Sequence, residues 1–222
     1  MIRWIVRHPL LASAAPLAAF LASAGLLLAL QSARRPPALV AGTGVPYAEG
    51  PDDFGEVGEF AFTERSGHTV TQDTLRGKVW IVGCFFTCCT ESCPKLSASM
   101  ARLQAELAGE PDVRLVSVTV DPTHDTPETL GRYATAYNAD ADRWLFLTGS
   151  EEGVRRFVRE RLKLAAEKNT AADATPGSRV LHDPRLTLVD RRGHIAGYFD
   201  GTDPAAVGRL KAAAERLARE AP

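Results

Sequence analysis

The sequence is poor in cysteine, and its few cysteines are confined to one short stretch. The chain of 222 residues holds 4 cysteines, namely Cys84, Cys88, Cys89 and Cys93. A disulfide framework spreads its cysteines along the chain so that they connect distant loops, and this clustering therefore excludes that class of protein. Clustered thiols instead indicate metal binding or thiol redox chemistry.

Clusters of basic residues are also missing from the larger part of the chain. Of the 26 basic residues, Arg3, Arg7, Arg34 and Arg35 precede Pro36, whereas all 27 acidic residues follow it, so the remainder of the chain is net acidic. Affinity for nucleic acid comes largely from Lys and Arg side chains that neutralise phosphates. A mildly acidic domain without such clusters argues against nucleic-acid binding.

Charge is absent between Pro9 and Leu30. These 22 residues would make about 33 Å of helix, enough to cross a bilayer core. A cleaved signal peptide is the alternative, but cleavage after Ala24 would leave an apolar segment on the mature terminus, and there is no lipobox cysteine. We expect a short tail (1–8), an uncleaved transmembrane anchor (9–31), a flexible linker rich in Pro, Gly and Ala (32–55) and one domain outside the membrane (56–222).

The cysteines follow an apolar stretch, Lys78–Phe86, which predicts a buried strand. Cys84 lies within this stretch and we expect it in the core, because free cysteine is among the most buried residue types. Cys89 and Cys93 stand four residues apart, and Pro94 favours a helix start there. Unpaired N–H groups at a helix start stabilise a thiolate, which is both a nucleophile and a ligand for soft metals.

Strand and helix patterns alternate along the rest of the domain. The predicted strands are residues 59–63, 68–71, 113–120, 144–148, a segment within 180–190, and 195–199. One predicted helix directly follows the cysteine segment, and three more cover residues 128–137, 151–164 and 203–220. This alternation predicts an α/β fold in which helices flank a mixed central sheet, preceded by an N-terminal hairpin, and a thioredoxin-like fold is the natural candidate.

Further polar residues follow the strand at 113–120. Asp121 and His124 come at its carboxyl end, where open α/β sheets place ligand sites, so His124 is a secondary candidate for a role at the site. Asp125 with Glu128 three residues later fits a capping box, and we expect Asp125 to cap the following helix. Met100 lies on an apolar helical stripe and is predicted to be a core residue rather than a metal ligand.

Three motifs of the chain resemble those of the Sco/SenC family of copper-handling proteins. The first, Phe86–Pro94, is similar to the family pattern FTxCxxxCP, and the second, Val120–Pro127, is similar to VDPxxDTP. The third is Leu181–His182 ahead of Leu186–Asp190. Their order and spacing match as well, and the resemblance covers most of the chain, from about residue 60 to residue 220.

The resemblance implies a membrane-anchored thioredoxin fold in which Cys89, Cys93 and His182 bind one copper ion. Thiolates suit Cu(I) and imidazole suits either oxidation state, so this donor set is chemically reasonable for Cu(I) or Cu(II). The chain departs from the family between the cysteines, where Thr90–Ser92 replace the usual proline and the frequent Asp-Val or Asp-Ile. Cys88 occupies a position that the family does not fix, and it is either a bystander or an auxiliary thiol.

These observations lead to hypotheses of different classes. The resemblance favours a copper metallochaperone, not an enzyme, that delivers copper to the copper-bearing subunit of a respiratory cytochrome c oxidase from the periplasmic side of the inner membrane. The alternative is a thiol:disulfide oxidoreductase in which Cys89 attacks and Cys93 resolves, and a copper sensor is a third possibility. The two main hypotheses differ in their need for His182: copper delivery requires it, and thiol–disulfide exchange does not.

Overall fold

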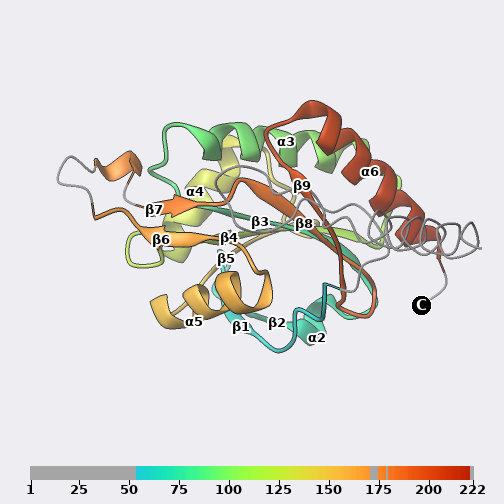
Figure 1. The fold of residues 1–222 in the computed structure, drawn as a ribbon, viewed down its shortest axis with the longest axis horizontal. Helices are drawn as coiled ribbons and strands as arrows, with labels where there is room; N and C mark the ends of the chain where they lie inside the picture. The colour runs from blue at the N-terminus through green and yellow to red at the C-terminus, as the bar shows by residue number, and fades with distance from the viewer. Residues whose placement is uncertain (1–53, 171–174, 179, 221–222) are drawn as a thin grey trace, which may run out of the picture. The chain divides into compact units, whose positions relative to one another are not determined.

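The computed structural model describes residues 54–170, 175–178 and 180–220 (Figure 1). The predicted tail and anchor, and all but the last residues of the predicted linker, lie outside these ranges. Across the described part of the chain, no helix has the length and apolar character needed to cross a membrane.

Seven strands form one mixed sheet in the order β2-β1-β5-β4-β3-β8-β9, and β6 and β7 form a separate two-stranded sheet. The strands are β1 (Ala61–Glu64), β2 (Thr69–Thr71), β3 (Val79–Phe85), β4 (Val113–Thr119), β5 (Trp144–Thr148), β6 (Ala166–Lys168), β7 (Val180–His182), β8 (Arg185–Val189) and β9 (Ile195–Asp200). The central strands β3, β4 and β5 run parallel, and the other pairs are antiparallel. The mixed sheet confirms the predicted α/β class.

Helices cover both faces of the large sheet (Figure 1). They are α2 (Gln72–Leu75), α3 (Ser92–Glu106), α4 (Pro127–Ala136), α5 (Glu151–Arg156), the π-helix η1 (Phe157–Arg161), the 3₁₀ turn η2 (Pro176–Ser178) and α6 (Pro204–Arg219). One core cluster contains buried residues of α3, α4 and α6. The second contains buried residues of α2, α5 and η1.

Strand β3 lies between these two cores, and every residue of it is buried. Because neighbouring side chains on a strand point to opposite faces, Ile81 and Phe85 join the first cluster whereas Trp80 and Val82 join the second. Cys84 belongs to the second cluster and is fully buried, which confirms the prediction of a core residue. Met100 of α3 is likewise a core residue.

Two predicted elements differ from those in the structure. The segment 180–190 is divided at Asp183 and Pro184, so that β7 pairs with β6 while β8 joins the large sheet. The predicted helix 151–164 changes to a π-helix at Phe157 and ends at Arg161. Sequence periodicity does not detect either change, because both depend on which partner each segment meets in space.

Candidate metal centre

The cysteine segment links the end of β3 to the start of α3. The backbone N–H of Cys89 donates to the carbonyl of Phe86 at 3.2 Å, which closes the turn after the strand. Helix α3 begins at Ser92, and no side chain caps its first turn. The N–H of Cys93 instead points at the sulfur of Cys89, at 3.4 Å. The Cys89 sulfur therefore lies at the helix N-terminus, where partial positive charge favours an anion.

His182 reaches the cysteines from β7. Its Nε2 atom lies 3.0 Å from the Sγ atom of Cys93, although 89 positions separate the two residues. The ligand atoms of Cys89, Cys93 and His182 all lie within 4.8 Å of one another. In the described part of the chain, no other group of three or more His, Cys, Asp or Glu side chains is so placed. The structure thus brings together the three residues that the sequence singled out.

The two thiols of the group differ in acidity. Burial tends to raise the pKa of Cys89, but interactions with His182 and Cys93 and hydrogen bonds from the backbone N–H groups of Cys93 and Glu91 outweigh it and lower the pKa to about 6. Burial raises the pKa of Cys93 far above its ordinary value, and the neighbouring Cys89 raises it further. At neutral pH the metal-free pair is therefore one thiolate, Cys89, and one thiol, Cys93.

The surroundings of His182 determine its tautomer. Its Nδ1 atom lies 3.2 Å from the carbonyl oxygen of Asp183, and because a carbonyl only accepts hydrogen bonds, Nδ1 carries the proton. The Nε2 atom then presents a lone pair toward Cys93. The edge of the Phe86 ring packs against the imidazole, with ring centroids 5.9 Å apart. His182 is thus prepared to bind a metal ion through Nε2.

Asp125 does not cap the following helix, as the sequence predicted, but has another structural role. The side chain of Thr126, not Asp125, caps α4 by accepting from the N–H of Thr129. Asp125 is buried and accepts hydrogen bonds from the backbone N–H and hydroxyl of Thr87 and from the hydroxyl of Thr119. It therefore ties the loop that carries the cysteines to the end of β4. This role was not predicted from the sequence, although Thr87 and Asp125 both belong to motifs that carry the family resemblance.

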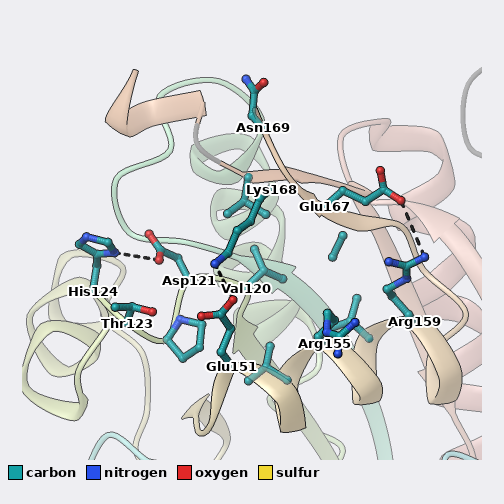
Figure 2. A pocket seen from close by; sticks show the side chains of 15 residues that line it. Val120, Asp121, Thr123, His124, Glu151, Arg155, Arg159, Glu167, Lys168 and Asn169 are labelled. Carbon is teal, nitrogen blue, oxygen red and sulfur yellow. Dashed lines mark hydrogen bonds and ion pairs between the residues drawn. The ribbon is translucent and has the colours of Figure 1, made fainter. Parts of the chain in front are cut away.

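The secondary candidate His124 lies at a pocket of about 670 Å³ beside the end of β4 (Figure 2). Its Nδ1 atom is 2.8 Å from a carboxylate oxygen of Asp121. Two ion pairs connect the remaining walls, Lys168 with Glu151 and Arg159 with Glu167. The structure therefore pairs His124 with Asp121 and does not group it with Cys89, Cys93 and His182.

The other two cysteines stand apart from this group. Cys84 is enclosed in the core, and burial raises its pKa to about 12, so it is an inert thiol at neutral pH. Cys88 is exposed, beside Cys89. Its backbone carbonyl and the Thr90 side chain lie so close to Gly177 that a Cβ atom there would be 3.1 Å from that carbonyl oxygen. The η2 turn thus packs directly on the cysteine loop.

The fold and the site together define a thioredoxin-like domain in which two cysteines and one histidine form a group that could hold a metal ion. The sequence profile of the SCO1/SenC family matches residues 49–218. The chain belongs to this family. It is 33% identical over 150 residues to the SCO1 protein homolog of Bacillus subtilis, an alignment that covers 67% of this chain and 75% of that protein.

Solved structures with the same fold agree with this assignment. One of them is BsSco, described as having a disulfide switch and as a member of the Sco family of cytochrome c oxidase assembly proteins. It is 29% identical to this chain, with a TM-score of 0.65, and the match covers 77% of this chain and 98% of that one. ScoI of Bradyrhizobium japonicum with copper bound has a TM-score of 0.57 at 24% identity and covers 72% of this chain and 98% of that one. The latter similarity establishes the fold alone.

Proposed function

We propose that this protein is a copper chaperone that binds one copper ion through Cys89, Cys93 and His182 and delivers it to the copper-bearing subunit of a respiratory cytochrome c oxidase. The observation that carries the proposal is the convergence of these three ligand atoms within 4.8 Å. Two sulfurs suit Cu(I), and the imidazole suits either oxidation state. Three protein ligands leave the ion open to a further ligand from the recipient, which a delivery protein needs.

The protonation states of the group fit a metal that is loaded and later released. The Cys89 thiolate is available without loss of a proton, whereas Cys93 must give up its thiol proton before it binds. Copper binding is therefore expected to release a proton from Cys93. Protonation of Cys93 would correspondingly assist the transfer of the ion to a recipient.

The proposal includes a location. The uncharged segment 9–31 would hold the protein in the inner membrane, and the linker 32–55 would place the domain 56–222 on the periplasmic side. Family membership and the composition of these segments support this arrangement. Mass spectrometry of the mature N-terminus tests it, because a protein that begins beyond Leu30 would refute the anchor.

The experiment that tests the chaperone proposal is a titration of the purified, reduced protein with copper, followed by metal analysis. We expect one tightly bound ion per chain, and no stoichiometric binding in the Cys93→Ala variant. The Cys84→Ala variant is the matched control, because it removes a thiol outside the ligand group and should retain one ion. Failure of the wild-type protein to bind copper would refute the proposal.

A second function is favoured by the unequal acidity of the two thiols. In a thiol:disulfide oxidoreductase, the Cys89 thiolate would attack a substrate disulfide and release one substrate thiolate, leaving a mixed disulfide. Cys93, after loss of its proton, would then attack Cys89, so that the second substrate sulfur leaves and a Cys89–Cys93 disulfide remains. Turnover that requires both cysteines and a dithiol reductant, but tolerates His182→Ala, would favour this function over copper delivery.

A further inference from the structure

Asp183 and Arg185, which follow the candidate ligand His182 with Pro184 between them, form a buried ion pair. The side chains of Asp183 and Arg185 are 0% and 7% exposed. The Arg185 guanidinium donates from Nε to both carboxylate oxygens, at 2.9 and 3.0 Å, and Nη2 donates to Oδ2. The other face of the guanidinium lies over the Tyr198 ring, 5.4 Å from its centroid. The pair is thus fixed on several sides.

The backbone of the same turn is fixed as well. The N–H of Asp183 donates to the carbonyl of Ala165, and the N–H of Arg185 donates back to the Asp183 carboxylate at 3.0 Å. Pro184, between them, has a restricted φ angle, and its carbonyl accepts from the N–H of Gly201. These contacts hold the turn at the point where the chain leaves the two-stranded sheet for the large one.

The turn also contains the acceptor that orients the histidine. The Asp183 carbonyl accepts the Nδ1 proton of His182 at 3.2 Å, and its direction follows from the hydrogen bonds on either side of it. We propose that the Asp183–Arg185 ion pair is a positioning device for His182, which holds this carbonyl in place so that the imidazole keeps its proton on Nδ1 and presents Nε2 to Cys93. The metal-binding consequence rests on the proposed copper function.

General energetics favour this role over a purely stabilising one. A buried ion pair has to repay the loss of hydration of both charges, and well-packed apolar residues often stabilise a core equally well. Fixing the orientation of a ligand is a different benefit, because partners of a metal-binding histidine keep its tautomer and ring orientation. The position of the pair, directly after His182 and within the same turn, accords with that benefit.

The test uses a double variant, Asp183→Asn with Arg185→Gln, so that neither charge is left buried alone. Val189→Ala is the matched control, since Val189 is a fully buried residue at the opposite end of β8. Nitrogen NMR of the metal-free, reduced protein reports the tautomer of His182, and competition with a Cu(I) chelator reports affinity. We expect a mixture of tautomers and an affinity lower by about 10- to 100-fold in the double variant, and wild-type values in the control.

Two outcomes separate this inference from the proposed function. A folded double variant with the wild-type tautomer and affinity overturns the inference while copper binding stands. If wild-type protein binds no copper, the copper proposal fails, and the tautomer in metal-free protein still decides the positioning role. Should the double variant not fold, Arg185→Lys decides, because it keeps the charge but not the two-pronged contact: a shifted tautomer population supports the inference, and an unchanged one overturns it.

Discussion

The Nε2 atom of His182 lies 3.0 Å from the Sγ atom of Cys93. On the other side of the imidazole ring, Nδ1 donates to the Asp183 carbonyl. Cys93 and His182 thus face each other, and the second ring nitrogen of His182 is held by the backbone.

Replacement of His182 by alanine should weaken copper binding strongly and leave the fold intact, because His182 lies at the end of a short strand outside the large sheet. Loss of an outer partner of a metal ligand costs about 10- to 100-fold in affinity, so loss of the ligand itself should cost at least as much. Competition with a copper chelator measures the change. His124→Ala is the control and should retain affinity, since His124 pairs with Asp121 instead. Equal affinities in the two variants would contradict the ligand assignment.

In the metal-free, reduced protein, the rate at which iodoacetamide modifies Cys89 should rise through a midpoint near pH 6 and then level off. Only the thiolate reacts, and the pKa of Cys89 is lowered to about 6. Peptide mass spectrometry distinguishes this residue from the exposed Cys88. A midpoint for Cys89 near its ordinary value of 9.0 would refute the expected thiolate.

Wild-type protein should lose stability relative to the Asp125→Asn variant as the pH rises above 3.8. Burial raises the pKa of Asp125 from its ordinary value of 3.8. A group whose pKa is raised in the folded state contributes stability below its unfolded pKa, and this contribution is lost as the pH rises through the folded value. Asparagine does not titrate, so the difference in free energy of unfolding between the two proteins isolates this group. Urea unfolding at a series of pH values measures it, and a difference independent of pH would contradict the raised pKa.

Substitution of Gly201 by alanine should lower the free energy of unfolding by about 1–3 kcal/mol, the usual cost of overpacking. A Cβ atom there would overlap the Leu96 side chain and lie 2.9 Å from the Pro184 carbonyl oxygen. Denaturant unfolding measures the effect. Gly208→Ala is the matched control, because nothing lies within 4 Å of a Cβ at this position inside α6. That variant should gain about 0.5–1 kcal/mol from the better helix propensity of alanine, and a loss of stability equal to that of Gly201→Ala would contradict the packing argument.

The residues that sequence reasoning located correctly have local signatures. The apolar run of β3, the helical spacing after the cysteines, and the alternation of strands and helices each lie within a short window, and the structure has the corresponding elements. The three residues of the candidate site were also found, but only because two cysteines are conspicuous and the family resemblance singled out His182. Spacing alone gave no reason to bring His182 to a pair of residues 89 and more positions away.

What the sequence did not predict depends on contacts between distant segments. Asp125 looked like a helix cap because Glu128 follows three residues later, yet its partner is Thr87, 38 positions earlier in the chain. The strand predicted within 180–190 is divided because Asp183 accepts from the backbone of Arg185 while Ala165 holds the N–H of Asp183. Neither arrangement leaves a periodic trace, since each is decided by three-dimensional proximity.

The division of the strands into two sheets gives a bound ion a thermodynamic role. Cys93 lies in the first turn of α3, which packs on the large sheet. His182 belongs to the β6–β7 hairpin, and strand pairing does not connect the two sheets in the described residues. An ion held by both residues would bridge 89 positions of the chain, and the unfolded chain would bind it weakly because it would have to close that loop. The free energy of unfolding of the copper-loaded protein would then rise with the logarithm of the free copper concentration. Delivery of the copper ion would return the protein to its less stable form.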